Sequence, residues 1–281
     1  MRPLRLTLHV VVLCALLSPL RARADHQAGS ERVDFTAYTL RSHEISVGIG
    51  AAAYGLSDEI TVGTYIPLWL AFPLVNAPIA SGYLKLRDWF HGPLAASVRA
   101  AFAYLPASVF SSALTTGAET RVGFFVLPME LSVSMRANES FSQSLQLSWV
   151  YVSLDGSRAQ DERRIRIGGA SAVTSLSLHL LSELRLSRVV ALTLRESVLL
   201  GGGDLQVRGE LERDGTTVDV QLGATQFYSG LVANIIAGVA LSWSNINLHL
   251  GVGVGSNWLP FLGLPVRMVT VVPDADFYIR F

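Results

Sequence analysis

The stretch Asp274-Ala275-Asp276-Phe277-Tyr278-Ile279-Arg280-Phe281 alternates between polar and apolar side chains along its whole length. Successive side chains of a β-strand point to opposite faces, so such a stretch has one apolar and one polar face. The two faces carry Ala275, Phe277, Ile279 and Phe281 on one side, and Asp276, Tyr278 and Arg280 on the other. The stretch therefore predicts a strand that separates an apolar from a polar environment.

This ending resembles the closing strand of bacterial outer-membrane β-barrels, which typically end in Phe after alternating apolar positions. The resemblance implies that Phe277, Ile279 and Phe281 form the signal read by the barrel-assembly machinery. The segment Tyr54 to Thr64 is similar to a hairpin that recurs in a loosely defined group of predicted outer-membrane barrels of diderm bacteria. The resemblance covers this hairpin and the residues from Pro273 to Phe281. It implies a barrel fold and an outer-membrane location, and no activity.

The amino-terminal residues have the pattern of a cleaved secretory signal peptide. Arg2 and Arg5 precede the apolar run 6–17, and Ala22-Arg23-Ala24 places small residues at positions −3 and −1 of a cleavage site. The run is too short for a membrane-spanning helix, which needs about 20 residues. We expect residues 1–24 to be the signal peptide and residues 25–281 to form one barrel domain, without the single cysteine, Cys14.

The composition favours a membrane barrel over a helical membrane protein. Half of the residues are hydrophobic, only 16% are charged, and the mean hydropathy is +0.40. After the leader, the longest apolar run, 231–243, is interrupted by Asn234 and is too short to span a bilayer as a helix. A chain embedded without such helices must pair its backbone groups between strands of a closed barrel. Removal of the four leader arginines leaves 18 basic against 22 acidic residues, which excludes a nucleic-acid partner on charge.

The same alternation recurs along the chain. It predicts further strands at 35–40, 43–53, 59–70, 83–87, 97–102, 130–136, 144–149, 175–180, 190–195, 205–212, 217–222, 231–243 and 246–254. With the closing strand, this predicts an all-β, transmembrane, antiparallel up-and-down barrel of about 14 strands, because bacterial barrels have an even number. If 35–40 is not a strand, the alternative is about 12 strands, with one further strand assigned wrongly. We expect 201–203 and 168–169 to be loop tips and 257–273 to be a long final loop.

A change of parity near Ser244-Asn245 supports hairpins over helices. Apolar residues occupy odd positions from Leu231 to Trp243 and even positions from Ile246 to Val254. A tight hairpin that keeps both apolar faces on one side produces this change, whereas a helix repeats apolar residues at intervals of three and four.

The polar faces of these strands predict the residues that line the lumen: Lys85, Arg87, Arg99, Glu130, Arg136, Arg195, Arg208, Glu210, Asp219, Asn247 and His249. Opposite charges on neighbouring strands pair with each other in any barrel of this kind. The functional interpretation is a water-filled passage whose charges orient small solutes. Both interpretations remain open at this point.

We therefore expect a porin-like passive channel for small solutes or a structural barrel, with no catalysis, cofactor or metal. The alternatives are an outer-membrane lipid-modifying hydrolase or acyltransferase and a soluble secreted all-β protein. His249 with Asn247 on one strand is the least poor catalytic candidate, because no G-x-S-x-G elbow is present. The expected partners are outer-membrane lipid, lipopolysaccharide and the assembly machinery, and we favour a monomer.

Overall fold

The computed structural model describes residues 34–66, 80–89, 93–106, 119–160, 165–213, 216–226, 232–243, 245–259 and 264–281. The expected signal peptide, with Ala22 and Ala24 at its cleavage site, lies outside these residues. No helix within the described ranges is long and apolar enough to cross a membrane.

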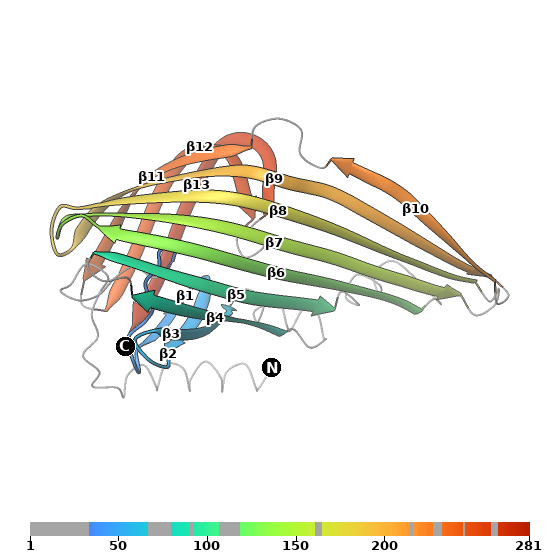
Figure 1. Ribbon diagram of the computed structural model, residues 1–281, viewed down its shortest axis with the longest axis horizontal. Helices are drawn as coiled ribbons and strands as arrows, with labels where there is room; N and C mark the ends of the chain where they lie inside the picture. Colours follow the sequence, from blue (N-terminus) through green and yellow to red (C-terminus); the bar gives the residue numbers. More distant parts are fainter. Residues whose placement is uncertain are drawn as a thin grey trace, which may run out of the picture.

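The described residues form thirteen strands in one antiparallel sheet (Figure 1). The strands are β1 (Ile45–Gly48), β2 (Ala51–Gly55), β3 (Ile60–Tyr65), β4 (Ala80–Trp89), β5 (Leu94–Pro106), β6 (Glu119–Arg136), β7 (Phe141–Gln160), β8 (Ile165–Arg185), β9 (Val190–Arg213), β10 (Thr216–Gln226), β11 (Ala233–Trp243), β12 (Ile246–Leu259) and β13 (Leu264–Arg280).

The sheet closes on itself as a ring of 12 strands. β9 pairs with β8 on one side and, through its first half, with β11 on the other. β13 pairs with β12 and with β1, where Ile45 and Phe281 exchange backbone hydrogen bonds of 3.0 and 2.9 Å. β10 pairs only with the second half of β9 and lies outside the ring. The all-β barrel is confirmed, and the strand number is that of the alternative, 12, not 14.

Three local differences give thirteen strands instead of 14, and the position of β10 outside the ring then leaves 12. The residues 35–40 do not form a strand, and the expected strand 43–53 is divided by a bend at Ile49–Gly50 into β1 and β2. The residues 205–212 continue β9 past a shift in register, so Gly201 to Gly203 are not a loop tip. Gly202 accommodates the shift with a φ of 95°, a conformation that suits glycine because it has no Cβ.

Two other expectations about connections were wrong. Gly168 and Gly169 pair with Glu210 and Gly209 inside the β8–β9 ladder instead of forming a loop tip. Most of the expected final loop, 257–273, belongs to β12 and β13, and only 260–263 lies outside the described residues. Both segments were expected to be loops because glycine and proline usually mark turns, but here the strands are long enough to run through them.

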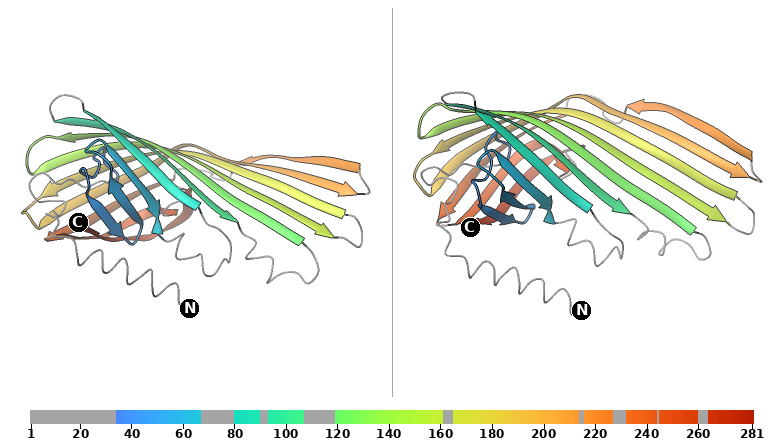
Figure 2. Two further views of the ribbon diagram at one scale, coloured as in Figure 1. Left: turned by 90° about the horizontal axis from the view of Figure 1, so that it is seen from below. Right: turned by 60° about the horizontal axis from the view of Figure 1, so that its bottom comes forward.

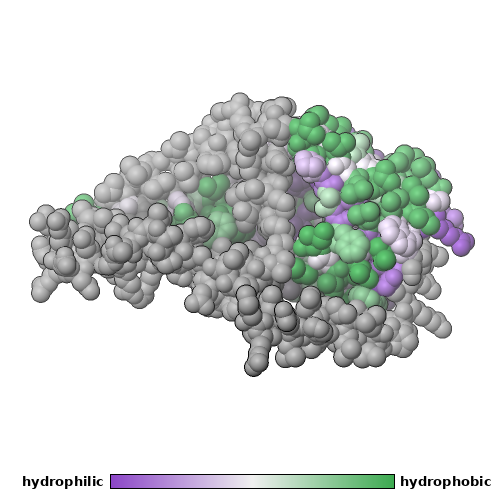
Figure 3. Space-filling model, turned by 180° about the vertical axis from the view of Figure 1, so that it is seen from behind, coloured by the Kyte–Doolittle hydropathy of each residue, from purple (hydrophilic) through white to green (hydrophobic). Residues whose placement is uncertain are grey.

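The outer face of the ring is apolar and the inner face is polar. Large apolar side chains alternate along the strands and stay exposed, as Leu131 (50%) and Val133 (41%) do, whereas Ser132 and Ser134 between them are buried. The space-filling view shows apolar side chains gathered on the outer surface of the ring (Figure 3). The interior contains mostly polar and small side chains, with small buried apolar clusters such as that of Ala103, Val126, Val150 and Val152.

The height of the wall differs greatly around the ring. β1, β2 and β3 have four, five and six residues, whereas β7, β8 and β9 have 20, 21 and 24. The long strands carry the sheet far beyond the ring, with β10 along its edge (Figure 2). We call β1–β3 the low wall. Its short strands leave the upper part of β13 without a strand partner on that side, within the described residues.

The segment that precedes β1 lies inside the ring. We call residues 34–41 the plug segment. Its residues Ala37, Leu40 and Tyr38 are buried, with exposed fractions of 0, 1 and 8%. It was expected as a first strand because apolar and polar residues alternate in it, but its backbone groups bond to side chains of the wall instead of a neighbouring strand.

Candidate functional site: a chamber in the barrel lumen

A chamber of about 460 Å³ lies in the lumen between the plug segment and the low wall. Strands from all around the ring contribute to its lining, which includes Tyr65, Tyr83, Arg99, Glu130, His179, Arg195, Ser197, Asn234, Asp274 and Asp276. Asp34 and Phe35 of the plug segment also line it. The volume is within the range of about 300–1,000 Å³ that small-molecule sites have.

The plug segment is held by hydroxyl groups and one lysine of the wall. The Ala37 amide donates a hydrogen bond of 2.7 Å to Ser134 Oγ, and the Leu40 amide donates one of 2.9 Å to Thr61 Oγ1. The ammonium group of Lys85, which is 4% exposed, donates a hydrogen bond of 2.7 Å to the Thr36 carbonyl oxygen. These bonds take the place of ladder bonds of a strand for the amides of Ala37 and Leu40 and the carbonyl of Thr36.

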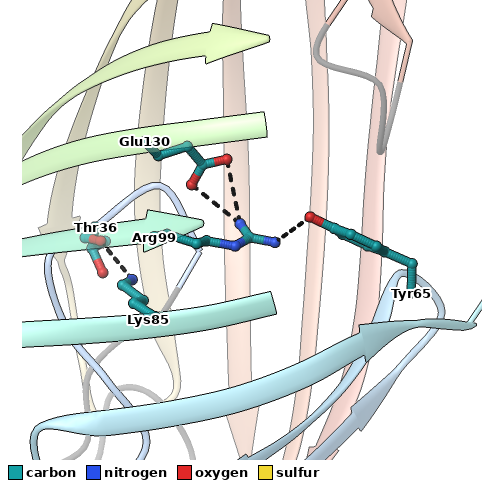
Figure 4. A network of polar contacts seen from close by, with 5 residues as sticks. All are labelled: Thr36, Tyr65, Lys85, Arg99 and Glu130. Atoms are coloured by element: carbon teal, nitrogen blue, oxygen red, sulfur yellow. Dashed lines mark hydrogen bonds and ion pairs between the residues drawn. The ribbon is translucent and has the colours of Figure 1, made fainter. Parts of the chain in front are cut away.

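Arg99 and Glu130 form the first charged cluster of the chamber (Figure 4). They are directly opposite each other on β5 and β6, and Arg99 Nη1 lies 3.2 Å from Glu130 Oε2. Arg99 Nη2 donates a hydrogen bond of 2.8 Å to the Tyr65 hydroxyl, and the guanidinium lies 4.4 Å from the centre of the Tyr83 ring. The carboxylate, the phenol and the aromatic face together hold the guanidinium in one orientation.

Arg195 and Asp274 form a second cluster across the chamber, from β9 and β13. Arg195 Nη2 lies 3.2 Å from Asp274 Oδ2, and its guanidinium lies 4.6 Å from the centre of the Phe35 ring. Phe35 has a φ of 59°, which is costly for a side chain of this size, by about 1–3 kcal/mol. The contacts of its ring with Arg195 and with His179, at 6.0 Å, offset this strain and fix the start of the plug segment.

Two histidines contact hydroxyl groups on the inner face. His179 Nδ1 and Ser197 Oγ are 2.8 Å apart, because His179 and Ser197 are paired residues of β8 and β9. His249 Nε2 lies 2.8 Å from Thr193 Oγ1, and His249 Nδ1 lies 3.3 Å from Asp274 Oδ2. The last contact has the distance of an ion pair. Thr193 and His249 are buried on the inner face and are not among the residues that line the chamber.

The structure places the predicted lumen residues as follows. Lys85, Asn247 and His249 are buried, and Arg87, Arg99, Glu130, Arg136 and Arg195 are partly buried. The side chains of Arg208, Glu210 and Asp219 are outside those that the structure describes. Only Arg99, Glu130 and Arg195 line the chamber. His249 and Asn247, the least poor catalytic candidate, lie on the same inner face of β12, where Asn247 bonds to Ser242 and His249 bonds to Thr193.

Several chamber residues were not found from the sequence. His179 and Ser197 are 18 residues apart and Asp274 is much further along the chain, and all three line the chamber only because of strand pairing. Phe35 was expected in a strand of the wall. Within the described residues, no three His, Cys, Asp or Glu side chains are grouped so that they could hold a metal ion.

We expect the substitution Glu130→Gln to destabilise the barrel by about 2–3 kcal/mol, because it leaves the partly buried Arg99 guanidinium without its carboxylate. Glu139→Gln is the matched control, since Glu139 is exposed in the turn between β6 and β7 and its replacement should cost below about 0.5 kcal/mol. Urea unfolding followed by tryptophan fluorescence measures both. Equal effects of the two substitutions would contradict a structural role of the Arg99–Glu130 pair.

The fold and the chamber define the class of this protein as a closed antiparallel β-barrel whose lumen contains the plug segment. No family model and no curated protein matches the sequence. Among solved structures, the chain is similar to LpxR from Salmonella typhimurium, at 9% sequence identity and a TM-score of 0.30, over 85% of this chain and 99% of that chain. A TM-score of this size supports no argument about function.

Proposed function

We propose that this chain is an integral outer-membrane barrel of a diderm bacterium that is closed at rest and has no chemistry of its own. The exposed apolar side chains of β4–β6, β9 and β12 support the membrane location, because in water a surface so rich in large apolar groups would cause aggregation. The same surface argues against the alternative of a soluble secreted protein. The even strand number of the ring agrees with bacterial barrels.

The observation that carries the closed state is the plug segment across the lumen. Between Phe35 and Leu40 it reaches from His179 and Arg195 on one side of the ring to Thr61 and Lys85 on the other. Ala37 packs against Ala95, so apolar contacts add to the hydrogen bonds. A constitutively open porin needs a water-filled path at this level. Of the two functions expected from the sequence, a structural barrel is therefore favoured over a porin-like channel.

A second candidate function is ester hydrolysis, favoured by the contact between His179 and Ser197 in the chamber. A hydroxyl within 2.8 Å of an imidazole is the arrangement of a nucleophile and its general base. This candidate is weakened because the contacting atom is Nδ1, whereas in a Ser-His-Asp triad the serine contacts Nε2 and the acid contacts Nδ1. The interpretation as a polar pair inside a barrel wall needs fewer assumptions.

Hydrolysis is tested with purified protein in phospholipid vesicles. We expect no release of fatty acid above the level of protein-free vesicles, and no difference between the wild type and Ser197→Ala. Release by the wild type that Ser197→Ala reduces about a hundredfold or more would establish the second candidate and overturn the non-catalytic proposal. Thr193→Ala is a control, because the hydroxyl it removes is buried outside the chamber lining and contacts the other histidine.

A further inference from the structure

The chamber reaches the outside of the barrel above the low wall. Its lining includes Ile49, Pro273 and Ala275. Pro273 and Ala275 point outward from β13, because Pro273 pairs with the exposed Val252 and both are exposed themselves. Ile49, in the bend between β1 and β2, is 62% exposed. Residues of the outer face can line an internal chamber only where the wall ends, so within the described ranges 34–66 and 264–281 the chamber opens sideways at this edge. We call this opening the side window.

At the side window, β13 has the backbone features of a strand edge without a described neighbour. Ile49 N donates a hydrogen bond of 2.9 Å to Phe277 O, and β1 pairs with β13 no further than this point among the described residues. Odd-numbered residues of β13, such as Phe277 and Phe281, turn their backbone groups toward β1. Pro273 is also odd-numbered, so its backbone nitrogen faces the open edge. Because proline has no N–H, no donor is left unpaired there.

The window lies at the depth of the lipid. Strands of four to six residues rise about 13–20 Å, whereas a strand that crosses the hydrocarbon core needs about 9–11 residues. If the barrel spans the membrane, the low wall ends inside the hydrocarbon core. The rim of the window, formed by Ile49, Pro273 and Ala275, is apolar and suits contact with acyl chains.

The interior of the chamber suits a headgroup with both signs of charge. Arg99 and Arg195 are each held against an aromatic ring, and guanidinium groups bind phosphate well. Asp276 lies on the inner face of β13 next to the window and offers a carboxylate to an ammonium group, beside Asp274, whose carboxylate pairs with Arg195. The volume of about 460 Å³ is that of a site for a small molecule, such as a headgroup with its glycerol.

We infer that the chamber binds the headgroup of a single-chain zwitterionic phospholipid, which enters sideways from the membrane while its acyl chain stays in the side window. This inference rests on the proposed membrane location. It assigns a ligand class to the chamber, and it explains why a closed barrel has a low wall next to a charged interior.

The test uses Gly50→Trp, which narrows the window without disturbing the fold. Gly50 lines the chamber, and a Cβ built on it meets no heavy atom within 4 Å. Ala52→Trp is the matched control, because Ala52 pairs with Val47 on the outer face, two residues further along the same hairpin. The full chain in nanodiscs is titrated with lysophosphatidylethanolamine, and bound lipid is counted by native mass spectrometry. Resistance of the folded band to unfolding in gel electrophoresis verifies each variant.

We expect the wild type and Ala52→Trp to bind one lysophosphatidylethanolamine with equal affinity, and Gly50→Trp to bind it at least about tenfold more weakly. Lysophosphatidylglycerol, which lacks the ammonium group, should bind at least about tenfold more weakly to the wild type. Equal binding by all three proteins, or none by the wild type, would overturn the inference. A wild type that stays soluble and fails to enter nanodiscs would instead overturn the proposed membrane location.

Discussion

Deletion of residues 34–40 is expected to turn a silent barrel into a conducting one. The deletion removes Phe35 and the amides of Ala37 and Leu40 that bond to Ser134 and Thr61, so the lumen gains a continuous aqueous path. In planar bilayers the wild type should show no discrete conductance steps, and ion flux through the variant should be at least about tenfold larger, because a ring of 12 strands without a plug leaves room for water and ions.

A milder variant tests the same prediction if the deletion variant does not fold. Ser134→Ala with Thr61→Ala removes the two hydroxyl acceptors of the plug segment and should give brief, intermittent openings. Ser148→Ala is the control, since Ser148 is a buried serine of the same inner face that lines the chamber. Conductance of the unmodified protein equal to that of the deletion would show that the plug segment does not close the lumen.

The substitution Leu131→Arg is expected to destabilise the barrel by about 2–4 kcal/mol in a bilayer, the cost of a cation facing the hydrocarbon core. Leu131 is 50% exposed in the middle of the outer face, and it pairs with Val98 and Leu147 on neighbouring strands. In a soluble protein the same change at an exposed site would cost less than about 0.5 kcal/mol. Urea unfolding in phospholipid vesicles measures the difference.

Leu186→Arg provides the matched comparison. Leu186 is 59% exposed in the turn between β8 and β9, at the end of the ring where charges meet water or headgroups. There the cost should fall to about 0–1 kcal/mol. The depth dependence, not the cost at one position, identifies a bilayer around the barrel. Equal and small costs at both positions would favour the soluble alternative.

The inward and outward faces were predictable because strand periodicity is local. The alternation in 131–136 and in 275–281 gave the correct faces, since a lipid-like exterior selects apolar residues at every second position. The change of parity at Ser244-Asn245 was likewise correct, and Trp243 pairs with Ile246 in the observed hairpin. The prediction of one strand over 43–53 was wrong. The chain reverses at the bend Ile49–Gly50, so Ala51 and Ala53 face the chamber and not the outside.

What the amino-acid sequence determined by itself is the class of fold: alternating strands, an apolar outside and a polar inside, in a closed antiparallel ring. The tertiary structure decided how many strands close the ring, that residues 34–41 lie in the lumen instead of in the wall, and that His179 meets Ser197 while Arg195 meets Asp274. Periodicity is a property of neighbours along the chain. Register, closure and the filling of the lumen depend on residues far apart in sequence, whose pairing no local pattern records.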